Sequence, residues 1–406
     1  MLKSFKTKLN LNNQQRTLAS QHAGVSRHAW NWGLNVCLTA KDAQEKRPSA
    51  IDLHKRLVAE VKSVNPWYYQ VSKCAPQQAL RYLDEAFKRC FKVPGTRQPK
   101  FKKKNIKDSF YLEGNIKISG NQIKIPKFGW VKCYEILPTV QPKNVTISKK
   151  ANDWYISFRY ELEPSPIRHT RKRIGVDVGI NALATCSDGT VFPNRKAYRK
   201  AKRKLAHLQR SFCRKQLGSK NRAKANLKVA RLHRKVANIR QDALHKLTTW
   251  LAKNHSEIVI ENLNVSGMLR NHRLASALAD CGFYEFKRQL EYKASWYGST
   301  VIRVDRFYPS SQLCSCCHHR QKMPLSKRIF KCGNCGMELD RDLNASINLE
   351  NWHAIIEFPT TVSSTGIACG ELSKLNGSTV KDSMKQEENV KFTWFAASFC
   401  DQSKFE

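Results

Sequence analysis

The sequence predicts a multidomain α+β protein, and three observations support this prediction. The chain has 406 residues, and a single hydrophobic core usually stops growing at about 250 to 300 residues. Apolar residues follow helical spacing over residues 1–95 and then alternate with a period of two over residues 109–163. From residue 172 onward, strand-like and helical segments alternate, which is typical of an α/β sheet.

The N-terminal region is predicted to be a helical segment inserted into a β-domain. Apolar side chains recur at helical spacing, which indicates one buried helical face. They are Ala79, Leu80, Tyr82, Leu83, Ala86 and Phe87. The strand-like segment SFKTKLNL precedes the helices, and NIKISG, QIKIPKF, NVTISK and WYISFRYELE follow them as strands. We therefore expect residues 1–11 and 91–168 to form a small β-barrel or sheet, with residues 12–90 as the helical insertion.

The central region is predicted to combine a β-meander with a strongly basic helix. KRIGVDVG, ALATCS and TVFPN are short strands separated by turn residues within 172–194. Eighteen Lys or Arg residues and no acid then lie between Arg195 and Gln241. Apolar residues step by three or four along this tract, at Leu232, Val236, Ile239, Ala243, Leu247 and Trp250. We expect a helix with an apolar seam and a cationic outside.

The C-terminal half completes the predicted α/β sheet. EIVIEN at 257–262 and STVIRVD at 299–305 have the pattern of buried strands, and the helical segment FYEFKRQLEYKASWY separates them. The tail after Trp352 has little periodicity, and we expect residues 357–406 to be largely disordered.

The charge of the chain predicts a polyanionic partner. Lys and Arg number 72 against 32 Asp and Glu, which gives a formal net charge of +40. Such a charge repels itself strongly unless a polyanion neutralises it, so we expect nucleic acid as the partner. No apolar stretch approaches the roughly 18 residues that span a bilayer, and the N-terminus lacks a secretory signal. We therefore expect no membrane association and a location in a prokaryotic cytoplasm or nucleoid, where the 14 cysteines stay reduced.

Four cysteines have the spacing of a structural zinc site. Cys314 and Cys317 form one C-x2-C pair, and Cys332 and Cys335 form a second pair after fourteen intervening residues. Four thiolates satisfy a tetrahedral zinc ion and leave no open position for catalysis. Cys316 is an alternative partner for Cys314, although a one-residue spacer closes a poorer chelate. A redox role for these cysteines is the competing interpretation.

Two acidic residues lie at the ends of buried strands. Asp177 stands in IGVDVG with apolar neighbours on both sides, and Glu261 ends the strand IVIE. Burial of an unpartnered carboxylate costs several kcal/mol, so each acid needs a bound cation or an Arg partner. A helix cap or a salt bridge is the structural alternative for either acid. In a chain of this positive charge, two such acids on adjacent strands favour a metal site.

A third acid comes from the segment DLNASINLENW and the residues before it, which are predicted to start a helix. Asp340 is well placed to cap the N-terminus of this helix, whereas Asp342 lies nearer its first turn and can reach across to a sheet. Three converging carboxylates would bind magnesium, which activates water and neutralises charge at a scissile phosphate. This pattern in so basic a chain indicates phosphodiester cleavage. Asp188 and Asp305 are explained instead by a turn and a strand end.

These motifs together resemble the TnpB family, the OrfB-type proteins encoded by bacterial insertion sequences. The resemblance covers most of the chain and rests on GVDVGINALAT, IVIENLNVSGM, the knuckles SSQLCSCCHHR and KCGNCG, and DRDLNASINL. WNWGLN, PKFKKK, GWVK and the basic tract also match family segments. The chain departs from the family pattern at His318, where Gly is usual, and at Ser346, where Ala is common.

The resemblance implies a RuvC-like nuclease domain of RNase H-like fold, in which three acids hold two magnesium ions. The matching residues are Asp177, Glu261 and Asp342, and the family favours Asp342 over Asp340 because its acid immediately precedes an x-N-A triplet. The implied activity is that of a Mg-dependent DNA endonuclease encoded by a transposable element. Such a protein pairs a guide RNA from the same element with double-stranded target DNA beside a short adjacent motif, and its zinc is structural.

The resemblance also implies a division of the chain into domains. We expect a wedge-like β-barrel domain at 1–11 and 91–168, a helical recognition insertion at 12–90, a RuvC-like nuclease domain at 169–308 and 337–356, a zinc ribbon at 309–336 and a tail at 357–406. The expected contacts to nucleic acid are Arg97, Lys100, Lys102, Lys103 and Lys104 in the first part of the chain, and Arg222, Lys228 and Arg234 on the basic tract.

Two other functions share parts of this pattern. A DNA-transposing recombinase would use the same acidic fold, but it must join strands as well as cut them. A non-catalytic nucleic-acid-binding regulator would need only the charge and the zinc ribbon. A compact type V CRISPR effector is a close relative with the same chemistry, and only a neighbouring repeat array would distinguish it.

Overall fold

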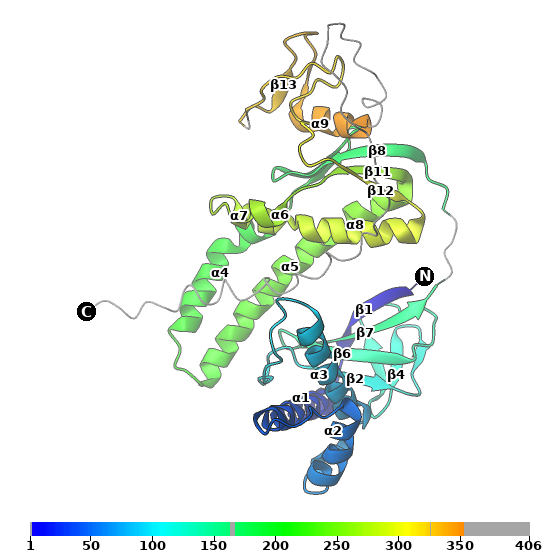
Figure 1. The fold of residues 1–406 in the computed structure, drawn as a ribbon, viewed down its shortest axis with the longest axis vertical. Coiled ribbons are helices and arrows are strands. Elements are labelled where there is room, and N and C mark those ends of the chain that lie inside the picture. Colours follow the sequence, from blue (N-terminus) through cyan, green and yellow to red (C-terminus); the bar gives the residue numbers. More distant parts are fainter. Residues whose placement is uncertain (1, 163–166, 325, 353–406) are drawn as a thin grey trace, which may run out of the picture. The chain divides into compact units, whose positions relative to one another are not determined.

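The chain folds into two compact units. A computed structural model describes residues 2–162, 167–324 and 326–352 (Figure 1). Residues 2–162 belong to the first unit and residues 167–352 to the second. No helix within the described ranges is long and apolar enough to cross a membrane. The tail for which we expect disorder lies outside the described residues.

The first unit is built on one seven-stranded antiparallel sheet, in the order β2-β6-β7-β1-β5-β4-β3. Its strands are β1 (Leu2–Asn10), β2 (Ser109–Glu113), β3 (Lys117–Ser119), β4 (Gln122–Ile125), β5 (Gly129–Cys133), β6 (Asn144–Lys150) and β7 (Asp153–Glu161). The N-terminal strand β1 lies inside the sheet, because it pairs with β7 over most of its length and with β5 at its end. Alternate residues such as Val145 and Ile147 are buried, as the two-residue period predicts. The predicted strands are confirmed, and closure into a barrel stays a prediction.

The helices of the first unit lie in the chain between β1 and β2, as the insertion hypothesis requires. They are α1 (Asn13–Asp42), α2 (Ala50–Arg56), the π-helix η1 (Leu57–Lys62), the 3-10 helix η2 (Pro66–Gln70) and α3 (Cys74–Lys92). Asn12 and Gln15 form a capping box that starts α1 just after β1 ends. Gly33 lets α3 pack closely on α1, since a Cβ there would lie 2.7 Å from Leu80 Cδ2. Tyr82, which we expected on the buried face of α3, is exposed because it lies on the flank of that face.

The second unit contains a mixed five-stranded sheet, in the order β10-β9-β8-β11-β12. Its strands are β8 (Arg171–Asp177), β9 (Ala182–Cys186), β10 (Val191–Pro193), β11 (His255–Glu261) and β12 (Thr300–Val304). The strands β8, β9 and β10 pair antiparallel as the predicted meander, and β11 runs parallel to both β8 and β12. The carboxyl ends of β8, β11 and β12 therefore meet at one edge of the sheet.

Helices cover both faces of this sheet (Figure 1). The helices of the second unit are α4 (Ala197–Cys213), α5 (Lys220–Asn254), α6 (Val265–Met268), α7 (Ala275–Cys281), α8 (Phe283–Tyr297) and α9 (Arg341–Glu350). On one face, Ile258 of β11 packs in a buried cluster with Leu247 of α5 and Leu290 of α8. On the other face, Val259 packs with Leu349 of α9. Neighbouring residues of β11 thus face opposite layers, and β11 is buried on both sides.

The basic tract forms two helices instead of the single helix that its spacing predicts. Residues 214–219 separate α4 from α5, and Ser219 caps α5 by accepting a hydrogen bond from Arg222 N at 3.1 Å. Along α5, Val236 and Leu247 are buried as expected, whereas Ile239 is exposed. The seam is wrong at Ile239 because the buried face of α5 runs through Val236, Leu244 and Leu251, and Ile239 lies to one side of that face.

A small ribbon, residues 309–324 and 326–340, connects the sheet to α9. Its strands β13 (Ile329–Lys331) and β14 (Glu338–Asp340) pair antiparallel, and Phe330 is buried against Cys314 and Cys332. The chain passes from β14 directly into α9, so the ribbon and α9 are continuous. Displacement of the ribbon would therefore move the start of α9.

The helix α9 lies directly on the backbone of β8. A Cβ at Gly175 would lie 2.0 Å from Ser346 O and 2.5 Å from Glu350 N, and both atoms belong to the backbone of α9. Distances this short are steric clashes that a side-chain rotation cannot relieve, so only glycine permits the approach. The approach fixes where α9 lies over β8.

We predict that Gly175→Ala lowers the free energy of unfolding of the second unit by about 1 to 3 kcal/mol, the usual cost of overpacking. Chemical denaturation of the full chain would measure this loss. Gly333→Ala is the matched control in the same unit, because a Cβ there would meet Gln321 Oε1 at 3.6 Å, an ordinary contact. Equal stability of the two variants would contradict the prediction.

Candidate functional site

Two of the three predicted acids end neighbouring strands and face the same side of the sheet. β11 pairs with β8 so that Ile260 lies opposite Val176. The next residues along the two parallel strands, Glu261 and Asp177, therefore lie beside each other. Successive residues of a strand face opposite sides, and Ile260 and Val176 pack with the residues of α5 and α8. Asp177 and Glu261 therefore face the side of the sheet that α9 covers.

The helix α9 brings the third acid to this pair. Asp342 lies in the first turn of α9. Burial of the Asp177 carboxylate, then the charge of Glu261 and then that of Asp342, raise the pKa of Asp177 to about 8, while Arg341 opposes the rise. The structure thus brings together three acids whose charges repel one another. A bound cation would relieve this repulsion.

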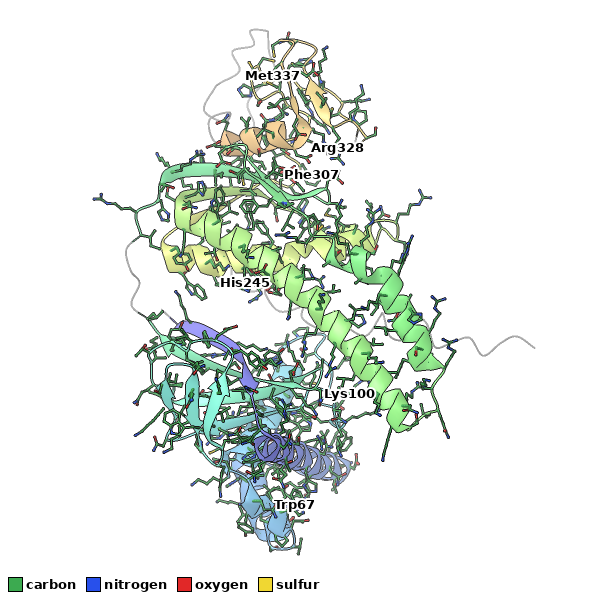
Figure 2. The ribbon with its side chains drawn as sticks, turned by 180° about the vertical axis from the view of Figure 1, so that it is seen from behind. Trp67, Lys100, His245, Phe307, Arg328 and Met337 are labelled. Carbon is green, nitrogen blue, oxygen red and sulfur yellow. The ribbon has the colours of Figure 1, made fainter. Side chains whose placement is uncertain are left out.

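The two aspartates at the start of α9 have different contacts. Asp340 Oδ1 accepts hydrogen bonds from Asp342 N at 2.9 Å and from Leu343 N at 3.1 Å, so Asp340 is the N-cap, as predicted. Asp342 Oδ1 lies 3.7 Å from Nη1 of Arg328, a ribbon residue beside α9 (Figure 2). Because Asp340 satisfies the helix N-terminus, the Asp342 carboxylate is not needed as a cap.

Glu261 has a hydrogen-bond partner that sequence reasoning missed. Ser310 Oγ donates to Glu261 Oε1 at 2.5 Å, and Ser310 is only 3% exposed. Ser310 lies in the loop that joins β12 to the first cysteine knuckle. A single serine in a loop belongs to no periodic pattern, and its one sequence signal was its position in the loop that follows the predicted strand STVIRVD.

The acids that we assigned to local structure have that role. Thr190 N donates to Asp188 Oδ1 at 2.9 Å in the turn after β9, and Arg171 Nη1 lies 3.1 Å from Asp188 Oδ2. Phe307 N donates to Asp305 Oδ1 at 2.8 Å just after β12. Neither acid is needed to explain the site.

The four cysteines predicted to bind zinc lie together in the ribbon. The Sγ atoms all lie within 4.8 Å of one another, those of Cys314, Cys317, Cys332 and Cys335. Cys316 is exposed and outside this group, so Cys317 completes the first pair. Hydrogen bonds from the backbone of His319 and the amide of Asn334 lower the pKa of Cys317, whereas the pKa of Cys335 in the same group is raised. The thiolate form that binds metal is therefore favoured at Cys317 and disfavoured at Cys335.

The acids are less tightly grouped than the thiols. Within residues 2–162, 167–324 and 326–352, the four cysteines are the one set of three or more Cys, His, Asp or Glu residues whose ligand atoms all lie within 4.8 Å of one another. The carboxylates interact through their charges at a wider spacing. A pair of metal ions about 3.5 to 4 Å apart requires ligands that are more widely spread than those of a single ion.

The residue that follows the first knuckle has a left-handed backbone. His318 has φ +59°, a region that glycine adopts without strain and that His tolerates better than most side chains. The departure from the glycine usual in the family at this position is therefore compatible with the same backbone path.

One predicted nucleic-acid contact has a partner within the protein. Asn31 Nδ2 donates to Lys102 O at 3.0 Å, and Lys102 N donates to Asn31 Oδ1 at 2.7 Å. Trp30 Nε1 donates to Lys100 O at 3.1 Å, and Lys102 Nζ lies 3.7 Å from the centroid of the Trp30 ring. Desolvation of this ammonium lowers the pKa of Lys102 to about 8, although the residue as a whole is exposed. The motifs WNWGLN and PKFKKK therefore bind each other.

The other predicted cations differ in their surroundings. Five of them are exposed, namely Arg97, Lys100, Lys103, Lys104 and Lys228, and Arg234 is partly buried. Arg222 Nη1 donates to Lys215 O at 2.7 Å, and its guanidinium lies 4.4 Å from the centroid of the Phe212 ring. Arg222 thus holds the turn between α4 and α5. Contact of any of these residues with nucleic acid stays a prediction.

Three protein families match parts of the chain. Residues 157–272 match a family described as a probable transposase, and this segment contains Asp177 and Glu261. Residues 283–349 match the Cas12f1-like TNB domain, and this segment contains the four-cysteine group and Asp342. Residues 1–46 match a helix-turn-helix domain.

One known relative matches nearly the whole chain, and another matches about a third of it. The "Putative RNA-guided DNA endonuclease InsQ" of Escherichia coli K12 is 35% identical over 91% of this chain and 94% of its own length. The "TnpB-like protein L79" of Acanthamoeba polyphaga mimivirus is 35% identical over 33% of this chain and 26% of its own length. A solved structure of a mini-RNA-guided CRISPR endonuclease is 10% identical, covers 86% of this chain and 92% of its own, and has a TM-score of 0.44.

We predict that Asp177→Asn stabilises the chain in the absence of divalent cations. The folded-state pKa of Asp177 lies above its unfolded value, so the native chain binds the extra proton and loses stability as pH rises from about 4 to about 8. The asparagine side chain does not titrate and has no such loss. The free energy of unfolding of Asp177→Asn is therefore expected to exceed that of the unaltered chain by about 2 to 4 kcal/mol at pH 8. Denaturant titrations of both proteins at pH 6 and pH 8 would measure it. A difference in stability that does not grow with pH would contradict the prediction.

Proposed function

This chain belongs to the TnpB family, and from that premise we propose that it is an RNA-guided DNA endonuclease encoded by a transposable element. The observation that supports this function best is the convergence of Asp177, Glu261 and Asp342 over the carboxyl end of one mixed sheet. Full-length relatives bearing the name of RNA-guided DNA endonuclease support the choice of activity. The alternation of strand and helix around the acids supports a RuvC-like, RNase H-like nuclease domain over 169–308 and 337–356.

The donor set of the acidic site fits magnesium. Mg²⁺ binds carboxylate oxygens and dehydrates reluctantly, so a few acids suffice to hold it. The raised pKa of Asp177 supports the same assignment, because a site that disfavours three negative charges gains from a divalent cation. Asp177, Glu261 and Asp342 would hold two ions, which supply an activated water and stabilise the leaving oxygen of the cleaved phosphodiester.

The protein contributes the geometry of this chemistry. Asp177 and Glu261 come from strand ends fixed by the sheet, and Asp342 comes from a helix fixed against Gly175. Asp340 occupies the N-terminal amides of α9 and so keeps Asp342 available. Carboxylates held by rigid elements need little rearrangement when a phosphate enters, which is the condition for electrostatic stabilisation of a transition state.

The four-cysteine group would hold one structural zinc ion. Its four thiols leave no position for a water or a substrate, so the ion would fold the ribbon and take no part in hydrolysis. The ribbon leads directly into α9, and its Arg328 contacts Asp342. Zinc would therefore act on the acidic site through the placement of α9.

Guide RNA and double-stranded target DNA are the proposed partners. The net charge of +40 supports a large polyanionic ligand. The exposed cations Arg97, Lys100, Lys103 and Lys104 are proposed backbone contacts on the β-barrel part at 1–11 and 91–168, beside the recognition insertion at 12–90. Proteins of this kind recognise duplex shape and a short adjacent motif and leave sequence reading to base pairing.

A DNA-transposing recombinase is the second candidate, because one matching family is described as a probable transposase. The same acids would serve it, but it must join strands as well as cut them. Incubation with a transposon-end duplex without RNA would distinguish the two, since joined products are expected only from the recombinase.

We predict that Asp177→Ala retains RNA and target binding but lowers the rate of target cleavage by about 100-fold or more, because it removes a shared metal ligand. Cleavage of a plasmid with a matched target, measured with and without guide RNA, would test this. Asp188→Ala is the matched control, because Asp188 accepts a hydrogen bond from Thr190 in a turn and pairs with Arg171. Undiminished cleavage by Asp177→Ala would refute the site assignment.

We predict that Cys332→Ser lowers the zinc content from about one ion per chain to almost none, since one thiolate of four is lost. Cleavage should fall with the zinc content, because the ribbon no longer places α9. Metal analysis and cleavage assays on the same preparation would check both. Cys316→Ser, which changes an exposed cysteine outside the group, should leave both quantities unchanged.

A further inference from the structure

The loop between β12 and the first knuckle contacts the acidic site through one buried hydroxyl. Ser310 Oγ donates to Glu261 Oε1 at 2.5 Å, and the residue is 3% exposed. The bond is charge-assisted and short, which makes it strong for a neutral donor. It occupies one carboxylate oxygen of Glu261 and leaves Oε2 for another ligand.

Two asparagines of α9 hold this same loop. Asn348 Nδ2 donates to Ser310 O at 2.8 Å and to Leu313 O at 2.7 Å. Asn344 Nδ2 donates to Leu313 O at 2.7 Å, and its Oδ1 accepts a hydrogen bond from Ser315 N at 2.9 Å. Both asparagines are fully buried, so these bonds do not compete with water and are costly to break.

These bonds join the parts of the site that come from different elements. Glu261 ends a strand, Asp342 begins α9, and Ser310 is bound to both elements at once, through its hydroxyl and its carbonyl. Tyr308 OH adds a bond to Asn348 O at 3.2 Å. Movement of the loop would therefore change the position of Glu261 relative to Asp342.

We propose that Ser310 is a positioning residue that orients the Glu261 carboxylate for metal binding, an inference that rests on the proposed nuclease function. A hydroxyl suits this role because it fixes an oxygen without cancelling the negative charge that attracts the cation. Arg328, beside Asp342, differs from Ser310 in its charge and its burial. Its guanidinium is positively charged, and its side chain is half-exposed. Partners that orient metal ligands in this way typically contribute about 10- to 100-fold in metal affinity.

The test is a Mn²⁺ titration of the zinc-loaded full chain, followed by the electron paramagnetic resonance signal of free Mn²⁺. Ser310→Ala is expected to weaken the Asp177-dependent binding by roughly tenfold or more. Ser310→Thr retains a hydroxyl and is expected to bind Mn²⁺ within about twofold of the parent chain. Ser299→Ala is the matched control, because it also removes a serine hydrogen bond, to Ala252 O at 2.8 Å before β12, away from the acids; it is expected to bind normally.

Three results would overturn the proposal: unchanged Mn²⁺ affinity in Ser310→Ala, an equal loss in Ser299→Ala, or no recovery in Ser310→Thr. Asp177→Ala distinguishes a failure of the role proposed for Ser310 from a failure of the proposed nuclease function. If Asp177→Ala binds Mn²⁺ like the parent chain, the acidic metal site itself is refuted. If Asp177→Ala loses the ion while Ser310→Ala keeps it, only the role of Ser310 is refuted.

A measurement on the unaltered chain covers the case in which Ser310→Ala does not fold. Because Ser310 links Glu261 to the loop, Mn²⁺ binding should slow amide hydrogen exchange across residues 306–315. Asp177→Ala should show no such slowing. Exchange in 306–315 that is unaffected by Mn²⁺ in the unaltered chain would also overturn the proposal.

Discussion

The packing of α9 on the backbone of β8 is the contact on which the acidic site depends. Asp177 and Glu261 are placed by the pairing of two strands, but Asp342 arrives from the far end of the described chain and has no strand to fix it. The missing Cβ of Gly175 lets α9 lie against the sheet. The geometry of the sheet therefore positions Asp177 and Glu261, and the close packing of α9 at Gly175 positions Asp342.

The site is held together against its own charge. Three acids repel one another, and burial together with the charges of Glu261 and Asp342 raises the pKa of Asp177. Apolar contacts on both faces of β11, the cap at Asp340 and the buried amides of Asn344 and Asn348 oppose this repulsion. The repulsion among the carboxylates is thus confined to a place where a bound cation can relieve it. Packing and hydrogen bonds outside the site stabilise the fold against this repulsion. Ligand-binding sites in proteins commonly have this arrangement.

Periodicity predicted most strands and helices and placed Asp177 and Glu261 at strand ends, because burial alternates along a strand whatever the rest of the fold. It failed where position depends on tertiary packing. Ile239 continues the three- and four-residue spacing but lies to one side of the face of α5 that is buried, whereas Val236 and Leu244 lie on it. Gly175 and Ser310 act through single contacts with residues far away in the chain, and such contacts leave no local pattern. The choice of Asp342 over Asp340 came from the family resemblance, since charge and spacing allowed both.

The binding of WNWGLN to PKFKKK has a consequence for the thermodynamics of association. Asn31 pairs with the backbone of Lys102 as a neighbouring strand would, and Trp30 holds the carbonyl of Lys100. The backbone that presents the exposed Lys103 and Lys104 therefore has few conformations to lose. A polyanion that meets these lysines would have to order their side chains only, and a larger part of each phosphate contact would remain as net affinity. A flexible basic loop with the same charge would bind more weakly.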